Sequence, residues 1–503
     1  MKKIYILLGA ILTACTAGNT NLFAASDDAF INKATVRETI ESIKTKNPAV
    51  NTELLTKGVE HAASLWRAED GSPADFKTFA GENYIADPAE RLEIFQKISN
   101  YIESLYGHNN EITLSLRKTL DESGGKIRNI DEMFGSYSPG AHLQSDFYEN
   151  KIAFVIALNF PYYTLGEKEK QSSQWTRTDW AMARLGDMFV SREPAELNQN
   201  AGKALGASEM YIASYNIYMG HLRTNDGRQL FPDNMVLLSH WNLRDEIKAD
   251  YADKVTGAEK QDMIYRVMER IIYQDIPQAV INSPEYEWAP YSNQVTKAGK
   301  EVKQDAEPDT RYKCIIDNFN AMRAYDAYNP EMNTFIERSF SGGMEIKQEE
   351  VEALFDSYLK SPLLATLGAK IKQRLGRDLK PYDIWYDGFK VRSTIPEDFL
   401  TSKTRALYPT PQAFNAGMKD MLIKLGWSPE RAAYIAEKIV VDPARGSGHA
   451  WGAAMKGSKS HLRTRISPAG MDYKGYNIAV HEFGHNVEQT ISMYDVDNYM
   501  MAS

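Results

Sequence analysis

The stretch HEFGHNVEQ, residues 481–489, lies near the end of the sequence and carries two histidines four residues apart. On a helix this spacing places both side chains on one face, about 40° apart. His481 and His485 can then reach a single Zn²⁺ ion, and Glu482 lies beside them. The pattern predicts a helical zinc site in which Glu482 takes a proton from a metal-bound water.

The residues around this motif predict a helix with two different faces. Over residues 476–494 the apolar side chains fall on the side opposite the histidines, and they are Val480, Phe483, Val487, Ile491 and Tyr494. This face is expected to pack on the core and leave the histidine face open. The alternative is a chance HExxH match on a solvated helix.

Glu488 lies on the histidine face, one turn beyond His485. It could be a third zinc ligand, a partner that orients the ligands, or a solvated acid. One straight helix rarely supplies three ligands to a tetrahedral ion, so the last two interpretations are favoured.

Two residues upstream of the motif are candidates for contact with a substrate. Residues 461–466 alternate like an edge strand, an element that can hold an extended peptide. Arg463 on this strand could contact a substrate or be a solvated surface charge. His449, in a glycine-rich turn, could donate a hydrogen bond to a peptide carbonyl or be a structural turn histidine.

The form HEFGH resembles the motif of the thimet oligopeptidase, or neurolysin-like, family of gluzincin metallopeptidases. ARGSGHAWG (444–452) and LKPYDIWYDGF (379–389) are similar to further segments of that family, whereas residues 486–488 differ from its usual Ala, Leu and His. The resemblance covers roughly residues 375–490. It implies a mainly α, two-lobed metallopeptidase-like fold, a small edge-strand element beside the motif helix, one Zn²⁺ ion and a peptide substrate.

The same resemblance implies a third zinc ligand outside this sequence. In that family the ligand is a Glu on the next helix, about twenty-five residues past the second His, and this position falls beyond Ser503. We therefore expect a chain that is truncated at its C-terminus. Asp495 and Asp497 are fallback ligands, although they lie close to the motif helix.

The first residues predict export. Lysines at positions 2 and 3 precede a short apolar run, residues 4–12, and Leu12-Thr13-Ala14-Cys15 resembles a bacterial lipobox. This predicts a signal peptide over residues 1–14 and lipidation of Cys15, giving a membrane-anchored lipoprotein. The alternative is an ordinary secretory signal that is cleaved near residues 24–25.

Composition limits the remaining classes of function. Of the 503 residues, 25% are charged and 43% apolar, which indicates a folded domain, and the net charge of −9 makes nucleic-acid binding unfavourable. Only two cysteines are present, so a disulfide framework is not expected. A soft boundary divides an N-terminal helical region, residues 15–344, from a catalytic region, residues 345–503.

Helix signals recur along the chain. Asp87-Pro88-Ala89-Glu90 predicts a helix start, and Gly107 a helix end. Ser428-Pro429-Glu430 predicts another start, residues 351–359 form an apolar stripe, and residues 152–160 could be a strand or a buried helix.

The leading interpretation is a zinc peptidase of the cell envelope. Two alternatives remain open. One is a helical lipoprotein without enzymatic activity that binds glycans or peptides, for which the aromatic stretch 286–291 could be a stacking platform or a packed loop. The other is a truncated peptidase that keeps the fold and lacks the activity.

Overall fold

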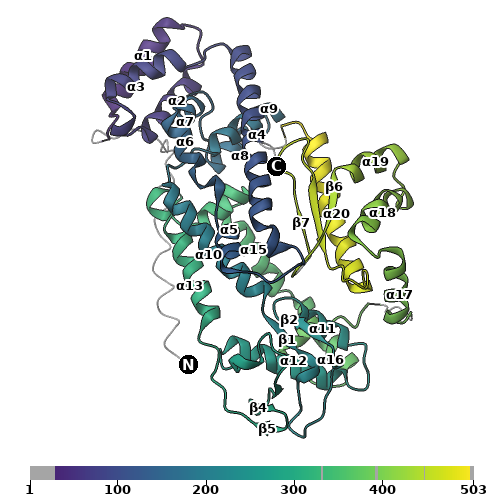
Figure 1. Ribbon diagram of the computed structural model, residues 1–503. Coiled ribbons are helices and arrows are strands. Elements are labelled where there is room, and N and C mark those ends of the chain that lie inside the picture. The colour runs from purple at the N-terminus through teal and green to yellow at the C-terminus, as the bar shows by residue number, and fades with distance from the viewer. Residues whose placement is uncertain (1–28, 330–331, 391–394, 447, 499–503) are drawn as a thin grey trace, which may run out of the picture.

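The computed structural model describes residues 29–498 except 330–331, 391–394 and 447. The chain is mainly helical, with three small sheets, which confirms the predicted fold class at this level (Figure 1). Cys15 and the predicted signal peptide lie outside the described residues. Within these ranges no helix is both long and apolar enough to cross a membrane.

The N-terminal part packs around one apolar core, in which Phe76, Phe95 and Phe154 are fully buried. Residues 152–159, left open between strand and helix, form a helix. The helices are α1 (Lys33–Lys46), α2 (Thr52–Leu65), α3 (Pro73–Asn83), α4 (Pro88–Asp121), α5 (Asn129–Gly135), α6 (Leu143–Glu149), α7 (Ile152–Asn159), α8 (Leu165–Gln171) and α9 (Arg177–Asp187).

Helix α4 begins where the sequence predicts and ends later. The Asp87 carboxylate accepts hydrogen bonds from the backbone N–H groups of Ala89 and Glu90, which caps the helix. Gly107 does not end it. A Cβ at Gly107 would lie 2.2 Å from Cγ of Met455, so the glycine serves a close packing contact inside the helix. The additional turns carry α4 alongside the C-terminal part of the chain (Figure 1).

The middle part has its own core, formed by two small antiparallel sheets and the helices beside them. Trp288 lies in this core with 1% exposure, and its indole N–H donates to Asn293, so the ring is not an exposed stacking platform. The elements are α10 (Ala195–Ala213), β1 (Asn216–Tyr218), β2 (Val236–Leu238), α11 (Asn242–Asp250), α12 (Gly257–Ile272), β3 (Glu287–Ala289), β4 (Gln294–Lys297) and β5 (Lys300–Glu301).

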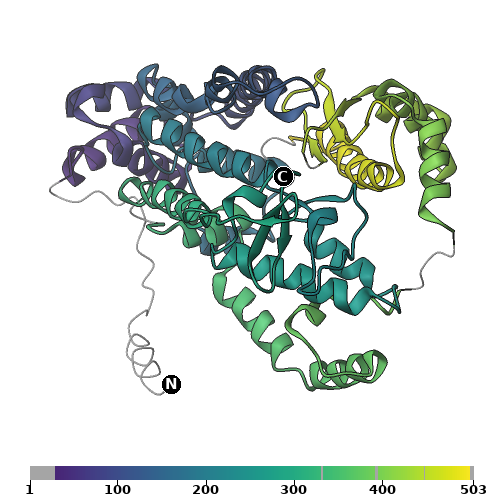
Figure 2. The same cartoon turned by 60° about the horizontal axis from the view of Figure 1, so that its bottom comes forward.

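A run of helices follows, and several of them expose apolar side chains. They are α13 (Thr310–Arg323), α14 (Phe335–Glu337), α15 (Gln348–Leu359) and α16 (Pro362–Leu375). The helix predicted over 351–359 is present as α15, but its stripe is exposed, with Leu354 at 69% and Leu359 at 67%. Figure 2 places these green helices away from the C-terminal yellow elements.

The C-terminal part combines helices with a three-stranded sheet. Its elements are α17 (Glu397–Leu407), α18 (Pro411–Lys424), α19 (Pro429–Glu437), β6 (Ile439–Pro443), β7 (His449–Trp451), β8 (Ser460–Thr464) and α20 (Tyr473–Asp495). As predicted, Ser428 caps α19. The strand order is β6-β8-β7, with β6 parallel and β7 antiparallel to β8.

The predicted boundary after residue 344 does not coincide with a division between cores. Leu375, Tyr382 and Trp385 pack with the middle core, whereas the C-terminal core draws its residues from Tyr408 onward. The domain division at 344/345 stays a prediction.

Candidate metal centre

Helix α20 carries the HEFGH motif and is fixed at its start to strand β8. The Asp472 side chain accepts a hydrogen bond of 2.7 Å from the backbone N–H of Gly475 and so caps the first turn. The Thr464 hydroxyl, at the end of β8, donates to the carbonyl of Gly475 at 2.8 Å. These contacts set the position of α20 on the sheet, and thereby that of the histidines two turns later.

The buried face of α20 is rotated from the one that the apolar pattern predicts. Phe483 is buried as expected, but Val480 is 44% exposed, so its assignment to the packed face was wrong. Asn486 and Thr490 are buried instead, and the Thr490 hydroxyl donates to the carbonyl of Asn486 at 2.8 Å. Because these polar side chains lie in the contact with the core, counting apolar residues alone placed the face incorrectly.

His481 and His485 are both exposed, on one face of α20. Their Nε2 atoms are 3.2 Å apart, and the two rings are nearly perpendicular, at 82°. Two nitrogens that are each about 2.05 Å from one zinc ion and 3.2 Å apart subtend about 100° at the ion, close to the tetrahedral angle. The same separation also suits a hydrogen bond between two neutral imidazoles. The pair therefore fits a zinc ion without requiring one.

The acidic residues of α20 have different surroundings. Glu482 is partly buried, next to His481 in the chain. Glu488 is exposed and accepts a hydrogen bond from the Ser492 hydroxyl at 3.2 Å. Asp495 forms an ion pair with Arg431 of α19, about 15 Å along the axis from His485. Across the described part of the chain, no group of three or more His, Cys, Asp or Glu residues is arranged to hold a metal ion.

One carboxyl group of α11, that of Glu246, is close enough to Lys474 near the start of α20 to interact with it electrostatically. Burial raises the pKa of Glu246, and the positive charge of Lys474 opposes this rise. Burial and the charge of Glu246 raise the pKa of Asp250 to about 7. Lys474 lies about 10 Å along the helix axis from His481, so Glu246 interacts with the start of α20, away from the two histidines.

Both the strand that the sequence indicated, β8, and the edge strand β7 pack beside α20. Strand β8, which covers most of residues 461–466, is the central strand, whereas β7 is an edge strand. The edge-strand assignment of residues 461–466 was therefore wrong. The alternation correctly predicts a strand. It does not predict that β6, which ends 17 residues before β8 begins, pairs with β8 in parallel and so makes β8 the central strand.

The two faces of this sheet have different chemistry. Leu462 of β8 packs against the α20 residues Ala479 and Phe483 in the C-terminal core. The residues on either side of β7 are glycines that lie close to α20: a Cβ at Gly448 would lie 2.2 Å from Cγ2 of Ile478, and one at Gly452 would lie 3.2 Å from the side chain of Gln489. The glycines of the GSGHAWG segment therefore allow β7 to approach α20 closely.

His449 and Arg463 lie on the opposite face, against α4. The Arg463 side chain is 1% exposed, and its Nη1 donates to Oδ2 of Asp121 at 2.7 Å and to Nε2 of His449 at 3.1 Å. Its guanidinium carbon lies 5.3 Å from the ring centroid of Trp451. The alternative of a solvated surface charge at Arg463 is wrong. Neither side chain faces α20, and a role in substrate binding stays a prediction for both.

Sequence reasoning missed the α4 residues that complete this network. The indole N–H of Trp451 donates to Oδ1 of Asn110 at 2.7 Å, and the amide of Asn110 donates to the carbonyl of Gly452 at 3.2 Å. Asp121 also binds Arg117, through two hydrogen bonds of 3.2 Å. More than 340 residues separate Asp121 from Arg463 and Asn110 from Trp451, so no local pattern could have paired them.

Comparison of the sequence with models of protein families and with curated proteins, and of the fold with solved structures, finds no match.

Proposed function

We propose that this chain is a zinc-dependent peptidase of the cell envelope, in which a metal-bound water attacks the peptide bond. The observation that carries the proposal is the pair of exposed imidazole nitrogens, 3.2 Å apart, on one face of α20. The resemblance of HEFGH and its flanking segments to the thimet oligopeptidase family supports the same activity and extends it to a two-lobed gluzincin-like fold.

In this proposal His481 and His485 hold the ion through their Nε2 atoms, and Glu482 is the general base. A bound zinc ion would polarise the scissile carbonyl and lower the pKa of its water. Glu482 would accept the proton of that water and later donate it to the leaving amine. A peptidase site of this type has three protein ligands, and none of the described residues is assigned as the third.

The sheet offers a place for the peptide backbone. The strand order leaves one side of β7 without a strand partner, and this strand packs beside α20. An extended peptide can form main-chain hydrogen bonds with such an edge. The proposed substrate is therefore a peptide in extended conformation, held along β7 with its scissile bond near the histidines.

The proposed location is the cell envelope, with Cys15 lipidated. A Cys15→Ser variant should move from the membrane fraction to the soluble fraction, because the acylated cysteine supplies the anchor. A variant that stays in the membrane fraction would argue against the lipobox.

The metal assignment is tested by zinc content. His481→Ala and His485→Ala should each lower the bound zinc to background, measured by mass spectrometry of the dialysed protein, because each removes a ligand. The matched control is His108→Ala, since His108 is an exposed histidine of α4 outside the motif. Full zinc occupancy in both motif variants would overturn the site.

The general base is tested by activity at constant metal content. Glu482→Gln should keep the zinc of the parent and hydrolyse a fluorogenic peptide about 10² to 10⁴ times more slowly, because an amide cannot accept the proton. Glu430→Gln, an exposed change on α19, is the control. Parent-like hydrolysis by Glu482→Gln would assign the base elsewhere.

A further inference from the structure

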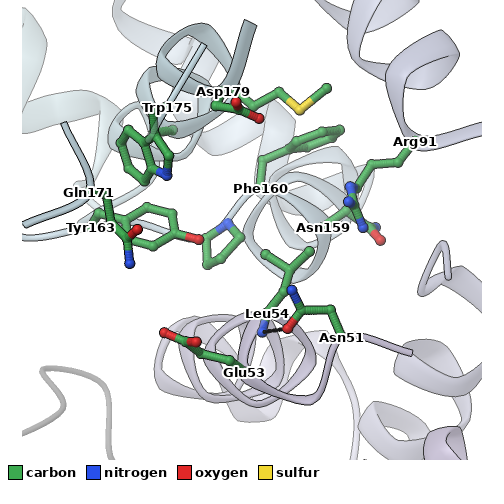
Figure 3. A pocket seen from close by; sticks show the side chains of 13 residues that line it. Asn51, Glu53, Leu54, Arg91, Asn159, Phe160, Tyr163, Gln171, Trp175 and Asp179 are labelled. Carbon is green, nitrogen blue, oxygen red and sulfur yellow. Dashed lines mark hydrogen bonds between the residues drawn. The ribbon is translucent and has the colours of Figure 1, made fainter. Parts of the chain in front are cut away.

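A pocket in the N-terminal part has no role in the proposed peptidase site. Its volume is about 270 Å³, near the lower end for ligand sites. It lies among α2, α4, α7, α8 and α9, and no residue of α20 lines it (Figure 3). A site of this size suits a ligand with few heavy atoms.

Some polar residues at this pocket already form hydrogen bonds within the protein. Asn51 caps α2 by accepting from the backbone N–H of Leu54, and Asp179 accepts from the backbone and hydroxyl of Thr176. Asn159 is 1% exposed and binds three backbone groups, two carbonyls and the N–H of Ile85. These side chains shape the wall and have little capacity left for a ligand.

Other polar groups at the pocket remain available. Within the described ranges, the side chains of Glu53, Arg91 and Gln171 form no hydrogen bond or ion pair with another residue. Arg91 and Glu53 stand on different sides of the pocket in Figure 3. Both charged side chains affect the pKa of the Tyr163 hydroxyl. Burial and the charge of Glu53 raise this pKa to about 12, and the charge of Arg91 opposes the rise. The pocket is thus lined by a cation and an anion that have no partner in the part of the chain that the structure describes.

The remaining wall is apolar and aromatic. Trp175 contacts Tyr163 and Trp180 nearly at right angles, with ring centroids 4.9 Å and 5.0 Å apart. The Lys57 ammonium lies over the ring of Tyr163 at 4.9 Å from its centroid. Leu54 and the buried Phe160 complete this wall. The rings form a packed wall rather than an open flat platform, which disfavours stacking of a sugar ring.

We propose that this pocket binds a free α-amino acid with an apolar or aromatic side chain. Arg91 would bind the carboxylate, Glu53 the ammonium group, and the wall of Trp175, Phe160 and Leu54 the side chain. A zwitterion supplies both opposite charges, which a neutral sugar of similar size lacks. The inference does not depend on the metal centre, because the two sites share no residue.

Titration calorimetry of the full chain tests this ligand class, with L-phenylalanine as the probe. The parent should bind phenylalanine, and phenethylamine and phenylacetate, which each lack one charged group, should bind at least about tenfold more weakly. Glucose should give no saturable heat. Because these comparisons use the unaltered protein, they do not depend on the folding of a variant.

Two substitutions then assign the ends of the ligand. Arg91→Met should weaken phenylalanine at least about tenfold and leave phenethylamine unchanged, whereas Glu53→Gln should weaken phenylalanine and leave phenylacetate unchanged. Arg37→Met and Glu82→Gln, exposed changes on α1 and α3, are the matched controls. The proposal is overturned if phenylalanine shows no binding at about 10 mM, if both variants bind it like the parent, or if glucose binds in its place.

Discussion

The two faces of the β6-β8-β7 sheet pack against different helices and do so with different kinds of side chain. Toward α20, β7 presents Ala450, the adjoining residues are Gly448 and Gly452, and β8 presents the buried Leu462. Toward α4, the same strands present His449, Trp451, His461 and Arg463, which form ion pairs and hydrogen bonds. The face toward α20 depends on small side chains, and the face toward α4 depends on paired charges and hydrogen bonds.

This difference separates two requirements of the proposed site. The small face brings the edge strand close to the histidine helix, so that a peptide on β7 could reach a metal on α20. The charged face fixes the sheet to α4 and thus to the N-terminal part. Substitutions on the two faces should therefore fail in different ways, the charged face through unpaired buried groups and the small face through overpacking.

The largest effect on the charged face should come from Asp121→Leu. The change leaves the guanidinium of Arg463 buried at 1% exposure, with Asp442 as the nearest carboxylate at 3.9 Å from Nε. We expect the free energy of unfolding to fall by about 3 kcal/mol or more in urea denaturation, because arginine cannot shed its charge. The double variant Asp121→Leu with Arg463→Met should recover part of this loss.

Glu209→Gln is the matched control, since Glu209 binds Arg117 as Asp121 does but its side chain is 61% exposed. It should cost less than about 1 kcal/mol. An equal loss of unfolding free energy in Asp121→Leu and Glu209→Gln would mean that the buried Asp121–Arg463 pair does not hold the sheet against α4.

An intermediate effect is expected on the small face from Gly448→Ala. The added Cβ would lie 2.2 Å from Cγ2 of Ile478 and 2.8 Å from the carbonyl oxygen of Arg463, so β7 or α20 must shift. Overpacking of this kind costs about 1–3 kcal/mol, measured by thermal or urea unfolding. Gly446→Ala, where the new Cβ would make an ordinary contact of 3.6 Å with Ala213, should change stability little. Equal stability of the two variants would remove the argument for close approach.

The smallest effect should come from Trp451→Phe. The phenyl ring keeps a partner for the Arg463 guanidinium but loses the 2.7 Å hydrogen bond to Asn110. A loss of about 1 kcal/mol in unfolding free energy is expected. Trp241→Phe, at a residue that is 46% exposed, provides the comparison. A loss as large as that of Asp121→Leu would place the indole, rather than the ion pair, at the centre of the contact.

Local signals in the sequence predicted local structure well. Asp87 and Ser428 cap helices because a short polar side chain before a proline satisfies free N–H groups, and this depends on adjacent residues only. The spacing of His481 and His485 likewise fixes their common face through helix geometry alone.

The errors came from contacts that are distant in the sequence. Gly107 is predicted to end a helix, yet its neighbour is Met455. Arg463 is predicted to be either a substrate contact or a surface charge, and the second alternative is wrong because Asp121 pairs with it. The buried face of α20 was displaced because Asn486 and Thr490 are polar residues in a core position. In each of these cases a tertiary partner overrode the local preference, and the sequence alone names no such partner.

The central claim is that the two histidines of α20 hold a zinc ion, and anomalous X-ray scattering tests it most directly. Crystals of the protein grown with Zn²⁺ should show, at the zinc absorption edge, one strong peak about 2.0–2.1 Å from Nε2 of both His481 and His485. The account would be contradicted by a map without a peak at this position, in which the two imidazoles bind only each other.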